Sequence, residues 1–232
     1  MSQHRYEQLI VARWQLNHSW ESLLANASID DLDHNEVRKT VSIAVDVNRL
    51  DSASLQDSVS EVLTKLELLE HGKITNAAMV LFAKSTSPGF SQCMIKMARF
   101  KGADKLGDFI DNQMVSGNSF EIMKAANEFV MRHLPVAGFF DENKLERIDK
   151  PLVPVLAIRE ALCNAICHRD YSVHNTSITL AIFDDKMEIW NNGVLTAPLT
   201  LEDLKKKHGS YPRNKKIARI FYLRKYVETW GT

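Results

Sequence analysis

The sequence lacks long hydrophobic runs. Its longest apolar stretches, such as residues 151–158, fall far below the roughly 20 residues that a membrane-spanning helix needs. The opening residues, MSQHRYEQL, have no apolar core behind their charges, which argues against a secretory signal. Three cysteines in 232 residues, an odd number, exclude a disulfide framework. We therefore expect a cytoplasmic protein in a reducing compartment, without a membrane partner.

Several catalytic motifs are also missing. The sequence has no G-x-x-x-x-G-K-[ST] phosphate loop, so nothing supports a helicase motor. It has no G-x-S-x-G nucleophile elbow and no paired catalytic carboxylates. Internal repeats and low-complexity tracts are absent. With 45% hydrophobic and 25% charged residues, the chain is typical of a globular protein that buries a sizeable core.

Charge is balanced in total but not along the chain. Lys+Arg and Asp+Glu both number 29, yet residues 201–232 carry a formal charge of +6 and residues 1–200 carry −6. A basic terminal segment indicates a phosphate-bearing partner, either a nucleotide or a nucleic acid. Ordinary solvated lysines on helices explain the same pattern equally well, so charge alone leaves the partner open.

The order of patterns predicts an α+β fold, with helices layered on a mixed, mainly antiparallel sheet. A helical region, a mixed α+β region and a region rich in motifs follow one another; their expected bounds are residues 1–72, 73–150 and 151–232. Apolar spacing, turn residues and caps such as Ser119 place the individual elements. The expected helices cover residues 6–16, 20–25, 59–69, 76–82, 119–133 and 152–168, and the expected strands cover residues 94–100, 176–183 and 187–190.

The helix expected over residues 152–168 carries one polar stripe. At about 100° per residue, Glu160, Asn164 and His168 fall on the same side. The nearly opposite side is apolar and holds Val155, Ile158, Leu162 and Ile166. One face is therefore expected to pack on the sheet, while a carboxylate, an amide and an imidazole project from the other. Every amphipathic helix has a polar face, so a purely structural stripe is the alternative.

Three sequence segments form an ordered set: REALCNAICHRDY, a strand pair that ends in MEIWNNG, and RNKKIA. Together they resemble the asparagine box and first glycine box of the GHKL ATPases. More closely, they resemble the RecG-like C-terminal ATPase family of bacterial transcriptional regulators. The matches cover residues 159–232, and a looser likeness that includes GKITNAAMVLF extends back to residue 66. The resemblance implies a truncated GHKL-like α/β sandwich in residues 151–232, because the family continues beyond this point.

The resemblance also implies an ATP site with Mg²⁺ bridging the phosphates. Asn164 is the expected metal ligand, because Mg²⁺ favours oxygen donors. Glu160 is the expected catalytic base, which accepts a proton from the water that attacks the γ-phosphate. Asn191 stands where most GHKL proteins have the aspartate that recognises the adenine amino group, and Gly193 permits close approach to the base.

Three further nucleotide-binding candidates follow from the same resemblance. His168 extends the polar stripe, and Gly231 is the remnant of a second glycine box. Arg213 stands where a lid would supply positive charge to the phosphates, although a solvent-facing charge at a helix start is the alternative. Zinc binding by Cys163, Cys167 and His168 is not expected, because structural zinc normally takes four ligands from separate elements. ATP and Mg²⁺ are the expected cofactors of the intact domain, with weak or no nucleotide binding in this fragment.

Two functions follow from these observations. The first is a Mg-ATP-binding module of a transcriptional regulator, a slow ATP hydrolase that acts as a conformational switch. The alternative is a DNA-binding or dimerisation module whose ATPase-like fold is a scaffold without turnover. It draws on the +6 segment and on the helix at Val59, which would belong to a winged-helix-like unit. The candidate partners are therefore ATP, duplex DNA and a second copy of the chain in a homodimer.

Overall fold

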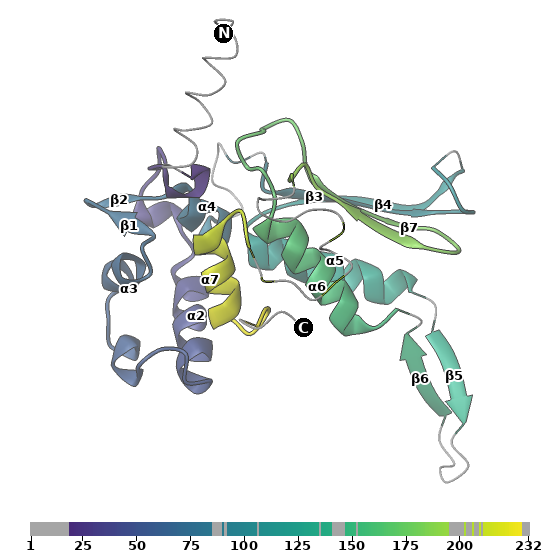
Figure 1. Ribbon diagram of the computed structural model, residues 1–232, viewed down its shortest axis with the longest axis horizontal. Coiled ribbons are helices and arrows are strands. Elements are labelled where there is room, and N and C mark those ends of the chain that lie inside the picture. The colour runs from purple at the N-terminus through teal and green to yellow at the C-terminus, as the bar shows by residue number, and fades with distance from the viewer. Residues whose placement is uncertain are drawn as a thin grey trace, which may run out of the picture.

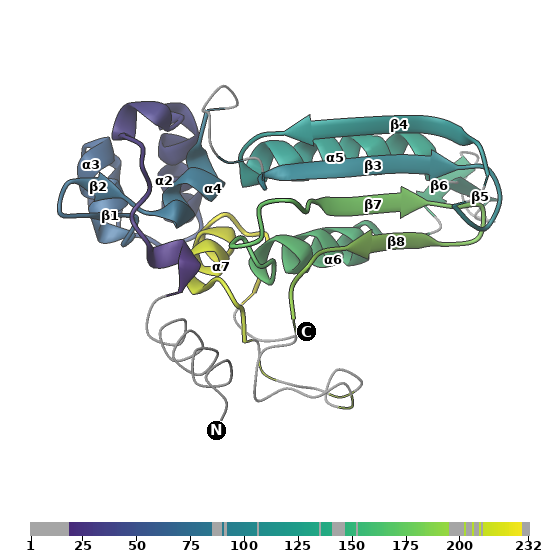
Figure 2. The same cartoon turned by 90° about the horizontal axis from the view of Figure 1, so that it is seen from above.

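The computed structural model confirms the α+β class. A four-stranded mixed sheet carries two helices on one face, and a unit of short helices lies beside it (Figures 1 and 2). Within the described residues, no helix combines the length and the apolar character needed to cross a membrane. The structure describes residues 19–84, 90, 92–105, 107–134, 136–140, 147–151, 153–194, 202, 206, 209 and 211–228.

The N-terminal unit is built from short helices and one small hairpin. Helix α2 begins at Asp33, whose carboxylate accepts the N–H groups of Asn35 and Glu36 (2.9 and 3.2 Å). Helix α4 is buried along its whole length and forms the centre of the unit. The elements are η1 (Trp20–Ser22), η2 (Ile29–Asp31), α2 (His34–Asp46), η3 (Ser52–Leu55), α3 (Val59–Lys65), β1 (Leu69–Glu70), β2 (Lys73–Ile74) and α4 (Asn76–Phe82).

The main sheet has the strand order β4-β3-β7-β8. Its strands are β3 (Met94–Phe100), β4 (Phe109–Ser116), β7 (Ile178–Ile182) and β8 (Met187–Trp190). Strand β3 pairs antiparallel with β4 and parallel with β7, and β7 forms an antiparallel hairpin with β8. One sheet therefore joins the second and third regions expected from the sequence, and the three-region division itself stays a prediction.

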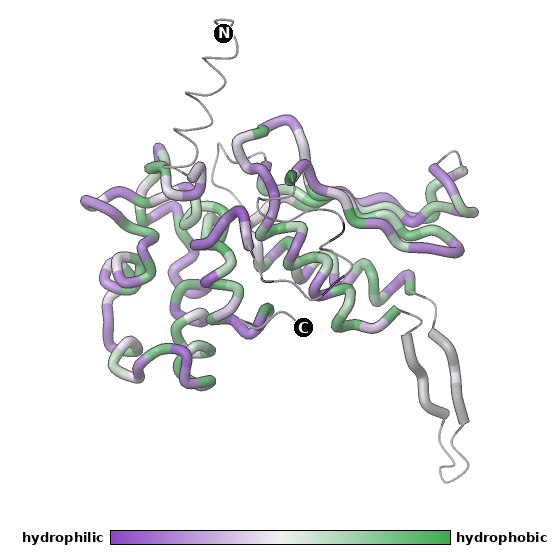
Figure 3. The backbone as a smooth tube through the Cα atoms, in the orientation of Figure 1, coloured by the Kyte–Doolittle hydropathy of each residue, from purple (hydrophilic) through white to green (hydrophobic). Residues whose placement is uncertain are grey.

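Helices α5 (Ser119–His133) and α6 (Val155–Cys167) cover one face of this sheet (Figure 2). Hydrophobic and hydrophilic residues alternate along both helices, as expected for elements with one buried face (Figure 3). The sheet residues beneath them, including Ile95, Met97 and Leu180, are at most 1% exposed. In the chain between α5 and α6, strands β5 (Val136–Phe140) and β6 (Arg147–Pro151) form an antiparallel hairpin that projects from the body of the molecule (Figure 1).

Helix α7 (Lys215–Leu223) connects the two halves of the molecule. It packs against α2, α4 and η1 on one side and against α6 on the other. Its apolar residues Ile217, Ile220 and Phe221 are fully buried and belong to a core that runs without a break from α2 to β7. Helix α7, which lies within the basic C-terminal segment, is therefore an internal connection of the fold.

Several local features differ from the sequence prediction. The helix expected over residues 20–25 is only the short 3₁₀ helix η1 (Trp20–Ser22). The helix expected to run through Leu69 ends at Lys65, because Glu67 and His71 adopt positive φ angles (60° and 50°) and the chain turns into the β1–β2 hairpin. Asn118 caps α5 in place of Ser119. Strand β4 was not expected. The helix expected over residues 6–16 lies outside the described residues.

Candidate functional site

The structure places Glu160 and Asn164 one turn apart on the exposed face of α6. The opposite side of the helix is buried, as Ile158 and Leu162 are at most 2% exposed. Val155, expected on the apolar face, is instead 44% exposed because it is the first residue of the helix. A carboxylate and an amide that share an accessible face offer the oxygen donors that Mg²⁺ prefers.

His168 ends the helix instead of continuing its polar stripe. It is the C-cap residue, and its N–H donates to the carbonyl of Asn164 (2.9 Å). Its imidazole is half-buried, and this burial lowers the pKa of His168 below its ordinary value. The imidazole of His168 is therefore uncharged at neutral pH. In this form it can donate or accept a hydrogen bond, but it does not supply a positive charge.

The Asn191-Asn192-Gly193 turn is docked on the C-terminal end of α6. The amide of Asn192 donates to the carbonyl of Asp170 (3.0 Å). Gly193 lies so close that an added Cβ atom would collide with the carbonyl oxygen of His168. The side-chain oxygen of Asn191 accepts the N–H of Gly193 (2.5 Å), which occupies one of its two lone pairs. Glycine is therefore required here for contact with protein backbone, a role distinct from the approach to a base.

Arg213 reaches the same end of α6 through an ion pair. Its guanidinium contacts the carboxylate of Asp170 at 2.6 Å, and both side chains are partly exposed. The other oxygen of Asp170 accepts the N–H and the hydroxyl of Ser172 (3.0 and 2.6 Å), which stabilises the chain reversal after the helix. Arg213 is thus held by a carboxylate and does not face solvent as a free charge.

Asn214 closes the end of α6 from the following position. Its backbone N–H and its amide both donate to the carbonyl of Cys167 (3.0 Å each), and the amide also donates to the carbonyl of Arg169 (2.8 Å). Helix ends leave carbonyls without intrahelical partners, and a buried amide satisfies them here. Asn214 belongs to the RNKKIA segment, but nothing in the sequence pattern predicts this capping role.

The remaining residues of the HRDY turn (His168 to Tyr171) are interior. Arg169 is fully buried and donates to the carbonyl of Thr176 (2.6 Å), while its Nε and Nη1 atoms find no hydrogen-bond partner among the described residues. Tyr171 donates its hydroxyl to the carbonyl of Ile166 (3.2 Å) and stacks on Trp20. The HRDY turn therefore fixes α6, the Asn191–Gly193 turn and the start of α7 relative to one another.

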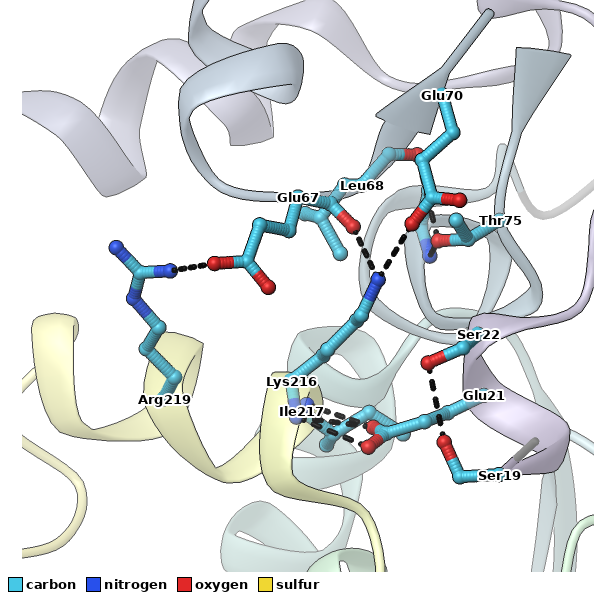
Figure 4. A network of polar contacts seen from close by, with 11 residues as sticks. Ser19, Glu21, Ser22, Glu67, Leu68, Glu70, Thr75, Lys216, Ile217 and Arg219 are labelled. Atoms are coloured by element: carbon cyan, nitrogen blue, oxygen red, sulfur yellow. Dashed lines mark hydrogen bonds and ion pairs between the residues drawn. The ribbon is translucent and has the colours of Figure 1, made fainter. Parts of the chain in front are cut away.

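Glu21 was missed by the sequence analysis and holds α7 from the N-terminal unit. Its carboxylate is 2% exposed and accepts the backbone N–H groups of Lys216 and Ile217 (3.1 Å each; Figure 4). A carboxylate is favourable at a helix N-terminus, where N–H groups lack partners. Burial, opposed by these hydrogen bonds, raises the pKa of Glu21. No local pattern links residue 21 to residue 216, so sequence alone could not reveal this contact.

Ion pairs surround this contact (Figure 4). Lys216 donates to Glu70 (3.0 Å) and to the carbonyl of Glu67 (2.7 Å), and Arg219 contacts the Glu67 carboxylate (3.3 Å). The buried Arg224 pairs with Glu36 on α2 (2.7 Å). In these pairs and in Arg213–Asp170, four basic residues after position 200 meet acidic residues before it, so part of the uneven charge is neutralised within the chain.

Gly231, a nucleotide-binding candidate, and the two cysteines of α6 add nothing to the described site. Gly231 lies outside the described residues. Cys163 and Cys167 are buried, and burial raises the pKa of the Cys163 thiol to about 12. In the part of the chain that the structure describes, no cluster of His, Cys, Asp and Glu could hold a metal ion.

Comparison with known proteins supports the motif resemblance. Residues 175–232 match the family model described as "Putative ATP-dependent DNA helicase recG C-terminal", which supports the predicted resemblance over this part of the chain. The crystal structure of the DIP2311 protein from Corynebacterium diphtheriae is similar in fold, with a TM-score of 0.70 and 16% identity over 94% of this chain. The match covers 42% of that protein, so this chain spans less than half of its length. No curated protein matches.

Proposed function

We propose that this protein is a Mg-ATP-binding module of a transcriptional regulator, because residues 175–232 match the model of the RecG-like C-terminal ATPase family. It would hydrolyse ATP slowly and act as a conformational switch. The observation that carries the proposal is the arrangement around α6. Glu160 and Asn164 share its exposed face, while the Asn191–Gly193 turn and the Arg213–Asn214 segment are both fixed to its C-terminal end.

The roles of the individual residues follow from their chemistry and position. Asn164 would supply an amide oxygen to Mg²⁺, which neutralises phosphate charge when bound. Glu160, one turn earlier, would accept the proton of the attacking water. Asn191 retains a free lone pair and its amide N–H groups for the adenine edge. Arg213 can turn to a phosphate only by leaving Asp170, so in our proposal nucleotide competes for this arginine.

A binding and turnover experiment tests the proposal. ATP affinity with Mg²⁺ is measured by isothermal titration, and phosphate release is measured under steady-state conditions. Glu160→Ala should abolish turnover and leave ATP affinity unchanged, because only the base is lost. Asn164→Ala should weaken Mg-dependent affinity. Glu128→Ala is the matched control, since Glu128 is an exposed glutamate on the neighbouring helix α5. Because ATP binding is expected of the intact domain, absence of ATP binding at millimolar concentration by a longer chain that completes this domain would refute the proposal.

The DNA-binding alternative has one observation in its favour. Helix α3 leads into the β1–β2 hairpin, the order of a winged-helix-like unit. Its exposed Lys65 is paired with Asp57 (2.6 Å), and most described basic residues of the C-terminal segment have acidic partners, which favours the nucleotide proposal. Duplex DNA binding that weakens steeply with salt would support the alternative. Reversing the charges of Lys205, Lys206 and Lys207 should then reduce that affinity.

A further inference from the structure

Strand β4 forms one border of the main sheet. It lies at the border opposite β8 (Figure 2), and no described strand pairs with its outer side. The N–H of Gly117 donates to the carbonyl of Cys93 beside β3 (3.1 Å). Backbone groups alternate along an antiparallel ladder, so those of Asn112, Met114 and Ser116 turn away from β3. Among the described residues, these groups form a row of donors and acceptors that no strand pairs.

This border lacks the usual protection of an edge strand. Native proteins blunt such edges with Lys, Pro, bulges or a covering element. The sequence FIDNQMVS contains no Lys, Arg or Pro, and its register irregularity, opposite Phe100, leaves residues 111–116 regular. Its one charged side chain, Asp111, contacts His133 (2.7 Å) and Arg132 (3.5 Å) on α5. The outward-facing residues are uncharged, and Met114 is 64% exposed.

We propose that β4 pairs antiparallel with β4 of a second copy of this chain, with the two-fold axis at Met114. In this register the outward-facing backbone groups meet and form up to about six hydrogen bonds. Met114 packs on its counterpart, and Asn112 lies opposite Ser116, so apolar meets apolar and polar meets polar. A register centred on Asp111 would bring two carboxylates together, which is unfavourable.

The strand is its own complement, which favours a second copy over an unrelated strand. The same surface serves both partners, so the assembly closes as a dimer with one continuous sheet of eight strands. Pairing at β4 leaves the exposed face of α6 accessible, because α6 lies beneath β7 and β8 and therefore away from the β4 border (Figure 2). The inference is therefore independent of nucleotide binding. Strand pairing alone buries little surface, so the dimer should be weak.

Sedimentation velocity over a concentration series tests the proposal. The unmodified protein should pass from monomer to dimer as concentration rises. Met114→Pro removes only an outward-facing N–H, so the β3–β4 ladder loses no bond while the dimer dissociation constant rises at least tenfold. Met114→Lys should act in the same direction. Met131→Lys is the control, because Met131 is an exposed methionine (49%) on α5. A protein that stays monomeric at its highest soluble concentration, or a dimer that Met114→Lys leaves intact, would overturn the proposal.

Crosslinking tests the register without depending on the stability of these variants. The native cysteines Cys93, Cys163 and Cys167 are buried, so an introduced thiol is the one that reacts. A short bifunctional thiol reagent should link two copies of Met114→Cys. It should also link Asn112→Cys to Ser116→Cys in a mixed sample in preference to either variant alone. Failure of Met114→Cys to crosslink would overturn the proposed axis.

Discussion

Glu21 should stabilise the protein through its contact with the first turn of α7. In Glu21→Ala, the backbone N–H groups of Lys216 and Ile217 lose their acceptor in a buried site. Loss of a helix cap costs about 1–2 kcal/mol, and an unsatisfied buried donor costs about 1–3 kcal/mol. Removal of a desolvated carboxylate offsets part of this cost. We expect a net loss of about 2 kcal/mol and a fall in Tm of about 4–8 °C for a chain of this size.

The pH dependence of this loss has a definite sign. Because burial raises the pKa of Glu21 above its ordinary value of 4.5, the folded protein favours the protonated carboxyl group. The stabilisation that results from this raised pKa is fully present below pH 4.5, and it is lost as the pH rises through the pKa of Glu21 in the folded protein. Gln cannot titrate in this range. The stability difference between the unmodified protein and Glu21→Gln should therefore be largest at low pH and narrow toward neutral pH.

Urea unfolding followed by circular dichroism measures both effects. Glu67→Ala is the matched control, because Glu67 belongs to the same network but its side chain is 65% exposed in its pair with Arg219. Exposed pairs contribute little, so this variant should change stability by less than about 1 kcal/mol. Equal stability losses for Glu21→Ala and Glu67→Ala would refute the capping role of Glu21. A stability difference between the unmodified protein and Glu21→Gln that widens as the pH rises would refute the predicted pH dependence.

Three further predictions follow from the end of α6 and from the buried thiols. Gly193→Ala should destabilise the protein in thermal melts, because the added Cβ collides with the carbonyl of His168; an unchanged Tm would contradict the docked turn. Asn214→Ala should cost about 1–3 kcal/mol in urea unfolding, because it removes the amide donor from the carbonyls of Cys167 and Arg169 and leaves only the backbone N–H bond to Cys167; Asn214→Asp, which keeps an acceptor only, should not restore the loss. Burial raises the pKa of Cys93 and Cys163 to about 12, so both thiols should resist a thiol reagent in the native protein and react in denaturant; rapid native labelling would contradict their burial.

Local patterns predicted the elements whose signals lie within one segment. The apolar spacing and caps around α5, and the alternation of β7 and β8, place these elements within a few residues of their observed bounds. Helix α4, which Thr75 caps, has the expected bounds. Strand β4 was missed because FIDNQMVS is an edge strand with most side chains at least partly exposed, and therefore shows no clear apolar alternation.

The candidate site was predicted in part for the same reason. The amphipathic pattern placed Glu160 and Asn164 on one exposed face, because that arrangement depends on a single helix. Long-range contacts carry no such pattern. The pairing of Arg213 with Asp170 and the cap that Glu21 provides to α7 depend on how distant segments fold together. The charge asymmetry was visible in the sequence, but its internal pairing was not.

The most direct test of the central claim is an NMR titration with Mg-ATP that locates the bound nucleotide. The side-chain amide signals of Asn164 and Asn191 should shift together and saturate at one affinity, while that of Asn35 on α2 stays unchanged. Omission of Mg²⁺ should reduce the shift of Asn164 most. If Mg-ATP shifts neither signal, or shifts only residues remote from α6, the exposed face of this helix is not a nucleotide site.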